Sequence, residues 1–277
     1  MNSFLQELAQ ALGTRYTIER EIAQGGMATV FLAQDAERQQ QVAIKIMHPD
    51  LVDAIGTERF FREMGIAASL DHPCIVPLYD SGKAGSVPYY IMPYVEGDSL
   101  YERLQRERRL SIGEAVRIAC DIAAGLGYAH TRGVLHRDVK PENILLAKGH
   151  ALVADFGLAR AIGAADYSKL TETGVIVGTV FYMSPEQLRE SKDLDQRSDI
   201  YSLGCMLYEM LTGGPPYTGR SLTEMVTRIL GAAVPSIRRL RPDVPPAVEQ
   251  AILRALAKQP AQRFATMEEF AAALPPA

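Results

Sequence analysis

The sequence predicts an α+β fold of two lobes: a small lobe with a five-stranded antiparallel sheet and one main helix, and a larger, mainly helical lobe. Three observations lead to this prediction. Strand-like runs recur up to residue 92, the pattern turns helical after residue 98, and no internal repeat or low-complexity linker interrupts the order. At 277 residues, the chain can bury a sizeable core in one large or two small domains.

Net charge and cysteine spacing limit the classes of function and the cellular location that the sequence supports. A net charge of −4 gives no global argument for binding nucleic acid or an anionic membrane. Cys74, Cys120 and Cys205 lie far apart without a C-x-x-C spacing, which argues against a zinc site or disulfides and for a cytoplasmic location. No signal segment and no run of ~18 apolar residues occurs, so we expect no membrane contact within this chain. Membrane anchoring of a longer protein stays open.

The first elements are a helix and a hairpin. Ser3 to Leu12 carries apolar residues at helical spacing, and Gly13 follows as a stop. Tyr16 to Ile22 alternates like a strand, and a second strand runs through Phe31 and Leu32. The glycine-rich turn between the two strands would let backbone N–H groups approach phosphate oxygens, although a plain hairpin turn looks the same.

A buried ion pair is expected next. Val42 to Lys45 reads as a strand with one cation in an apolar run, whose head would otherwise lie in water. Thr57 starts a helix whose 3.6-residue period places three residues on one face: Phe60, Glu63 and Ala67. Because a carboxylate on an apolar face needs a partner, we expect Glu63 to pair with Lys45.

The sheet is expected to close with two further strands, Ile75 to Tyr79 and Val87 to Met92. Residues 93–97 then read as a connector, because the helical pattern begins behind them. The predicted domains are therefore an N-terminal lobe at 1–92, a hinge at 93–97 and a C-terminal lobe at 98–277.

Helices dominate the second lobe. Ser111 to Glu114 has the pattern of a capping box before a long helix that ends ahead of Gly133. Asp199 to Leu211 is apolar nearly all round and is expected at the centre of the lobe. Shorter helices are predicted near 221–230, 246–257 and 267–274, the last with a box at Thr266 to Glu269.

The polar loop His136 to Asn143 is the strongest candidate for chemistry. Pro141 excludes a helix interior there, and short buried strands are expected on both sides, at Gly133 to Leu135 and Ile144 to Leu146. An Asp, a Lys and an Asn side by side suit proton acceptance, anion binding and metal ligation. Asp155, before Phe156 and Gly157, adds a second oxygen ligand of the kind that Mg²⁺ prefers.

These motifs, in this order and spacing, resemble a serine/threonine protein kinase domain, most closely the eukaryotic-like kinases of bacteria. The match covers nearly the whole chain and includes Ser184-Pro185-Glu186 in place of the A-P-E motif. The glycine-rich turn departs from the family pattern, because Ala23 and Ala28 replace the outer glycines. The resemblance implies a bilobal protein kinase-like fold that transfers the γ-phosphoryl group of ATP to Ser or Thr hydroxyls of proteins.

The resemblance also implies roles for individual residues. Asp138 would accept the proton of the substrate hydroxyl, while Lys140 and Lys45 would neutralise phosphate charge. Asn143 and Asp155 would bind Mg²⁺ or Mn²⁺. The ATP contacts would come from the turn, the sheet, the hinge and the strand after the loop: Ile22, Ala23, Gln24, Gly25, Gly26, Met27, Ala28, Thr29, Val30, Ala43, Lys45, Glu63, Met92, Pro93, Val95 and Leu145. Pro93 lies where the family uses only a carbonyl.

Further positions are expected to support the site or to regulate it. By resemblance, Asp199 anchors the backbone of the catalytic loop, and Glu186 pairs with Arg263. The segment between Gly157 and Thr179 carries two expected autophosphorylation sites, Thr171 and Thr173. Thr179 would touch Asp138 and Lys140, whereas Arg137 and Arg160 would face the phosphate. Possible partners are protein substrates and a second copy of the chain.

Two other functions compete with that of an active protein kinase. A pseudokinase scaffold would share the fold, but Lys45, Glu63, Asp138, Asn143 and Asp155 are all present. A small-molecule kinase of related fold would lack the Ser-Pro-Glu segment that shapes a peptide site.

Overall fold

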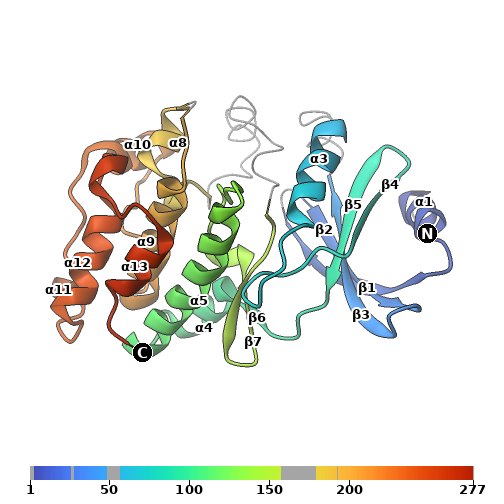
Figure 1. The fold of residues 1–277 in the computed structure, drawn as a ribbon, viewed down its shortest axis with the longest axis horizontal. Coiled ribbons are helices and arrows are strands. Elements are labelled where there is room, and N and C mark those ends of the chain that lie inside the picture. Colours follow the sequence, from blue (N-terminus) through green and yellow to red (C-terminus); the bar gives the residue numbers. More distant parts are fainter. Residues whose placement is uncertain (1–2, 26–27, 49–56, 157–178, 192, 277) are drawn as a thin grey trace. The chain divides into compact units, whose positions relative to one another are not determined.

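A computed structural model of the chain describes residues 3–25, 28–48, 57–156, 179–191 and 193–276 (Figure 1). These residues form two compact units. The first holds the described residues up to His72, then Val76–Glu96 and Phe156, and the second holds Pro73–Ile75, Gly97–Asp155 and the described residues from 179 onward. A hinge at 93–97 stays a prediction.

Unit 1 is built on the predicted five-stranded antiparallel sheet. Its strands follow the order β1-β2-β3-β5-β4. The elements of this unit are α1 (Ser3–Leu12), β1 (Tyr16–Gln24), β2 (Ala28–Asp35), β3 (Gln40–Met47), α3 (Thr57–Ala67), β4 (Asp80–Ala84) and β5 (Val87–Pro93). In the centre of the sheet, Lys45 pairs with Val30 of β2 and with Tyr90 of β5.

The two faces of the sheet bury different helices. Leu8 and Leu12 of α1 pack with Ile44 and Ile46 in one apolar cluster. Phe60 and Met64 of α3 belong to a second cluster, together with Met47 and Tyr90. Because side chains alternate along a strand, Lys45 lies on the same face of β3 as Met47, which is the face that α3 covers.

The position of β4 corrects one prediction. We expected a strand over Ile75 to Tyr79, but the strand runs from Asp80 to Ala84. Pro77 has no N–H to contribute to a ladder, and pairing with β5 begins where Tyr79 donates its N–H to Ile91 O at 2.7 Å. Ile75 instead forms an isolated parallel bridge with Val153.

Unit 2 is mainly helical (Figure 1). Its helices and short helical turns are α4 (Leu100–Glu107), α5 (Ile112–Thr131), η1 (Pro141–Asn143), η2 (Thr179–Tyr182), α8 (Pro185–Leu188), α9 (Arg197–Thr212), α10 (Leu222–Gly231), α11 (Ile237–Leu240), α12 (Pro246–Ala255), η3 (Pro260–Gln262) and α13 (Met267–Ala272). As predicted, α9 is buried along nearly its whole length, and it ends at Gly213, whose φ is +90°. This helix is the centre of the unit's core.

A small three-stranded sheet contains the strand that follows the polar loop at 136–143. It consists of β6 (Asp98–Ser99), β7 (Ile144–Ala147) and β8 (His150–Val153), in that order. The strand predicted after the loop therefore exists as β7. The strand predicted before the loop, at Gly133 to Leu135, is wrong, because Gly133 has a φ of +72° and closes a turn after α5.

In two of the predicted capping boxes, only one of the two expected hydrogen bonds forms. Ser111 and Thr266 each accept a hydrogen bond from the N–H three residues on, as expected. The carboxylates of the boxes have other partners: Glu114 accepts from Arg103, and Glu269 accepts from the N–H of Ala265. A nearby arginine or a neighbouring amide thus competes with the N-cap amide.

Candidate active site

The catalytic loop, residues 136–143, is fixed by one carboxylate from the central helix. Asp199 in α9 is fully buried and accepts the N–H of His136 at 2.9 Å and the N–H of Arg137 at 2.8 Å. Burial opposes its ionisation, but the interactions with His130 and His136 together outweigh that effect and lower the pKa of Asp199. The anchoring role that was expected of Asp199 is confirmed.

His130 is a residue that the sequence analysis missed. Its Nε2 lies 2.7 Å from Asp199 Oδ2, so the carboxylate is shared between the end of α5 and the catalytic loop. Nothing in the local sequence marks this histidine, because its partner lies 69 residues away. His136 has an equally structural position: it is buried, and its Nε2 lies 2.8 Å from Ala154 O.

Three predicted functional side chains meet within the loop. Lys140 Nζ lies 2.9 Å from Asp138 Oδ2. Asn143 donates through Nδ2 to the carbonyl of Asp138 at 2.8 Å and to its Oδ2 at 3.2 Å. The other carboxylate oxygen, Oδ1, is buried and has no hydrogen-bond partner among the described residues. The two carboxylate oxygens of Asp138 thus differ: Oδ2 is held by Lys140 and Asn143, whereas Oδ1 has no hydrogen-bond partner among the described residues.

Lys140 remains a cation in this setting. Burial alone would lower its pKa, but the carboxylate of Asp138 and, more weakly, those of Glu142 and Asp155 raise it above the usual value. A charged ammonium is therefore held beside the candidate base.

Asn143 and Asp155 are linked through the backbone. The N–H of Ala154 donates to Asn143 O at 2.9 Å, which brings the residue before Asp155 next to the loop. Asp155 has a φ of +65°, a left-handed conformation that non-glycine residues rarely adopt. The Oδ1 of Asn143 accepts no hydrogen bond from the described residues. A carboxylate and a free amide oxygen fit a hard cation such as Mg²⁺.

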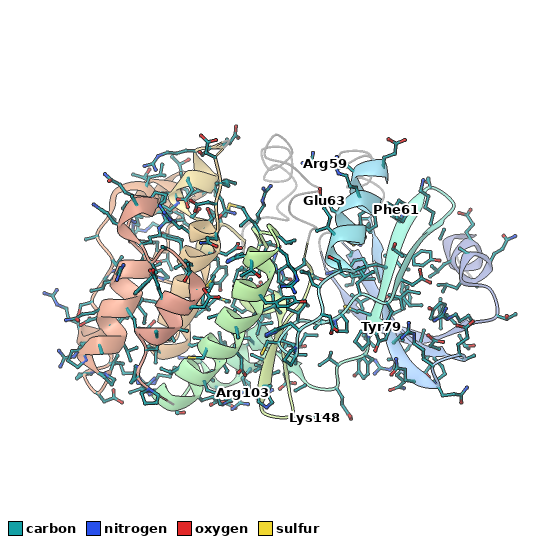
Figure 2. All side chains as sticks on the ribbon, viewed as in Figure 1. Arg59, Phe61, Glu63, Tyr79, Arg103 and Lys148 are labelled. Carbon is teal, nitrogen blue, oxygen red and sulfur yellow. The ribbon has the colours of Figure 1, made fainter. Side chains whose placement is uncertain are left out.

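In unit 1, Lys45 and Glu63 occupy the same side of the sheet. Glu63 lies on α3 (Figure 2) and is only 2% exposed. Phe60 and Ala67 of the same helix are also buried. Lys45 faces α3, and its Nζ lies 6.0 Å from the ring centroid of Tyr90. This arrangement agrees with an ion pair between Lys45 and Glu63, which stays a prediction.

The predicted ATP-binding positions in unit 1 line one part of the sheet. Ala43 pairs with Met92, and Val42 pairs with Pro93. Ala23 and Ala28 lie in β1 and β2 without positive φ, so neither alanine strains the backbone. The remaining described positions lie in β1 or β2, directly after β1, or in the connector: Ile22 and Gln24, Thr29 and Val30, Gly25, and Val95.

Several expected positions lie elsewhere or outside the described part. Leu145 belongs to β7 of unit 2. The described residues do not include Gly26 and Met27, nor Arg160 and the two threonines at 171 and 173. The side chain of Thr179 is also outside them. The convergence of the unit 1 and unit 2 residues on one nucleotide stays a prediction.

The Ser-Pro-Glu segment forms the start of α8 and is firmly held. Glu186 accepts from Arg263 at 2.6 and 2.8 Å and from Ser198 at 2.8 Å, so the expected buried ion pair is confirmed. Burial would raise the pKa of Glu186, but the hydrogen bonds from Arg263 lower it. Ser184 caps α8 through a complete capping box with Gln187, a residue that the sequence analysis missed. The S-x-x-Q spacing itself is the signal that could have found it.

Comparison with known proteins agrees with this geometry. Residues 16–273 match the protein kinase domain family. The chain is 41% identical over 272 residues to the serine/threonine-protein kinase PknB of Mycolicibacterium smegmatis, covering 96% of this chain and 43% of that protein. It is also 41% identical over 267 residues to the serine/threonine-protein kinase PrkC of Bacillus subtilis, covering 96% of this chain and 41% of that protein.

A third relative, PknB of Mycobacterium tuberculosis, is 39% identical over 279 residues, with 95% of this chain and 43% of that protein covered. The chain thus spans less than half the length of the curated relatives it matches. No described helix has an apolar stretch of sufficient length to cross a membrane. The family match covers nearly the whole chain, and we conclude that it belongs to the protein kinase domain family, as a catalytic domain of the bacterial serine/threonine type.

Proposed function

We propose that this chain transfers the γ-phosphoryl group of ATP to Ser and Thr hydroxyls of proteins. The observation that carries the proposal is the state of Asp138. Its Oδ2 is oriented by Lys140 and Asn143, and its Oδ1 is buried without a partner among the described residues. A carboxylate in this state can accept the proton of a substrate hydroxyl and aim its oxygen.

The neighbouring cation completes this half of the site. Lys140 stays protonated because the carboxylates of Asp138, Glu142 and Asp155 together outweigh the effect of burial on its pKa. Its charge would stabilise the negative charge that builds up on the phosphoryl group during transfer. Asn143 and Asp155 would hold Mg²⁺ or Mn²⁺, which supplies charge neutralisation for the phosphate oxygens when it is bound.

Unit 1 would bind the nucleotide. Lys45 would contact the α- and β-phosphates, with Glu63 fixing its ammonium from α3. The adenine would lie against Ala43 and Met92, which are cross-strand partners. The carbonyl of Pro93 and the backbone of Val95 would read the edge of the base. These roles follow from the family resemblance and from the face of β3 on which Lys45 lies.

The test of this function is Asp138→Asn. The substitution keeps the size of the side chain but removes the base, so we expect transfer to fall by about 10²- to 10⁴-fold. Labelled ATP with a generic basic protein as acceptor measures the rate, and thermal unfolding checks that the variant is folded. Label transfer at the wild-type rate by the variant would refute the assignment of the base.

Regulation by the segment after Asp155 is the second part of the proposal. Phosphate on Thr171 and Thr173 would add about −1.5 to −2 charges at each site, and these charges would pair with Arg137 and Arg160. We expect both threonines to become phosphorylated during incubation with Mg-ATP, as peptide mapping by mass spectrometry would show. Asp138→Asn should carry no phosphate at either site. Phosphate found only at other positions would contradict this part.

The same reaction suggests the setting in which the chain works. Autophosphorylation between copies requires a transient homodimer, and ATP and protein substrates are cytoplasmic, so we propose a cytoplasmic kinase domain.

A further inference from the structure

Gln187, in the first turn of α8, connects two parts of unit 2 that are 50 residues apart in sequence. Its Oε1 accepts the N–H of Ser184 at 2.9 Å, which completes the capping box. Its Nε2 donates to the backbone carbonyl of Arg137 at 2.8 Å. One side-chain amide thus joins the start of α8 to the catalytic loop.

The orientation of this amide is determined by its partners. The backbone N–H of Ser184 can only donate, and the carbonyl of Arg137 can only accept. Reversal of the amide would place two donors together at one end and two acceptors at the other. The donor therefore faces the catalytic loop.

The carbonyl that Gln187 binds belongs to a strained residue. Arg137 has a φ of +68°, and a left-handed conformation at a non-glycine residue persists only when its surroundings hold it. Asp199 Oδ1 accepts the N–H of Arg137 at 2.8 Å, and Gln187 holds its carbonyl. The N–H and the carbonyl of Arg137 are thus both hydrogen-bonded, and the next residue in the chain is Asp138.

Helix α8, which carries Gln187, is also firmly held. Glu186, the neighbour of Gln187, forms the buried ion pair with Arg263, and both side chains are nearly inaccessible to water. Because α8 is anchored there, the amide of Gln187 acts from a fixed point, and its hydrogen bond restrains the loop.

We propose that Gln187 is a positioning residue for the phosphoryl transfer: its Nε2–H holds the strained peptide before Asp138 so that the carboxylate is aimed at the substrate hydroxyl. This inference rests on the proposed function of Asp138. It goes beyond helix capping, because capping uses only the Oε1 of Gln187.

Gln187→Glu separates the two roles. Glutamate is an ordinary partner in a capping box and can still accept the N–H of Ser184, but it has no donor for the carbonyl of Arg137. We expect kcat at saturating ATP and peptide to fall by about tenfold, as for a lost hydrogen bond to a buried group. The KM for ATP should change by less than about twofold, since no nucleotide contact is altered.

Two further variants complete the experiment. Gln187→Met has similar length and loses both hydrogen bonds, so it should lose kcat to the same degree and also unfold at lower temperature. Glu102→Gln makes the reverse exchange in the capping box of Ser99 on α4, where the side chain of residue 102 is exposed and bonds Ser99, and should keep the wild-type kcat. Thermal unfolding of all variants is measured in parallel.

The outcomes distinguish the two proposals. Wild-type kcat in Gln187→Glu, with a loss only in Gln187→Met, would mean that Gln187 merely caps α8 and would overturn the inference alone. Should Gln187→Glu fail to fold, Gln187→Met still tests the inference, because wild-type kcat without the bond to the carbonyl of Arg137 would overturn it. Wild-type activity in Asp138→Asn would refute the proposed function and this inference together.

Discussion

Lys258, which follows α12, shows how one half-buried side chain makes stability depend on pH. Its Nζ donates to Tyr217 at 2.8 Å and to Ile229 O at 2.6 Å, and no carboxylate pairs with it among the described residues. Burial lowers the pKa of Lys258 to about 8, and the charges of Arg263 and Arg189 act in the same direction. Burial of the protonated amine of Lys258 therefore lowers the free energy of unfolding.

The sign of the resulting pH dependence follows. Below pH 8 the ammonium of Lys258 is charged in both the folded and the unfolded protein, so the destabilisation from its burial is present in full. Above pH 8 the folded protein loses this proton before the unfolded protein does, and the destabilisation disappears. We expect the free energy of unfolding of the wild type, relative to Lys258→Met, to rise between pH 7 and 9.5 by about 1–2 kcal/mol, discounted for water access. Urea denaturation of both proteins measures this difference. A constant difference would show that Lys258 has an ordinary pKa.

Backbone conformation at single residues marks the limit of prediction from the sequence. The chemical types of Asp138, Lys140 and Asn143 could be predicted, because a polar loop with a proline indicates a site. The left-handed φ of Arg137 and of Asp155 could not, because arginine and aspartate ordinarily avoid that region. Such strain depends on partners that are distant in sequence, here Asp199 and Gln187.

Two glycines in helices have opposite roles. Gly65 lies in α3, and a Cβ built on it meets nothing within 4 Å. Gly204 lies in α9, where a Cβ would come within 2.9 Å of the Cβ of Ala255 and 3.3 Å of Leu256. Gly65 thus has space for a side chain, whereas Gly204 allows α9 and α12 to approach closely.

We therefore expect Gly65→Ala and Gly204→Ala to change stability in opposite directions. Alanine at 65 should raise the free energy of unfolding by about 1 kcal/mol, through helix propensity. Alanine at 204 should lower it by about 1–3 kcal/mol, through overpacking. Urea denaturation of the two variants provides a matched comparison. Equal effects of both substitutions would contradict this account.

Elements were predictable where a pattern is local. The 3.6-residue period placed α3 and α9 correctly, and Gly213 marked the end of the latter. The prediction failed for Ile75–Tyr79, because the alternation of residues does not show that Pro77 lacks an N–H for a ladder and that the strand paired with β5 begins only at Asp80. It also failed for half of each box at Ser111 and Thr266, because the competing partners Arg103 and Ala265 are set by tertiary contacts and local geometry.

For the whole molecule, the order of motifs predicted an α+β protein with a five-stranded sheet, and the family match agrees. The long-range contact between Glu186 and Arg263 was expected from resemblance and is present. The network of His130 with Asp199 was not expected, because a single histidine at the end of a helix has no local signature.

Residues 73–75 have a consequence for how the chain could be divided. Although they lie between α3 and β4 in sequence, they belong to unit 2, where Cys74 O accepts the N–H of Val153 at 2.8 Å and packs against Gly125. A protease that cut the chain near residue 97 would therefore not release a complete helical fragment. The C-terminal fragment would lose the backbone partner of Val153 and expose the surface of α5 at Gly125. We therefore expect it to aggregate or unfold more readily than the intact chain.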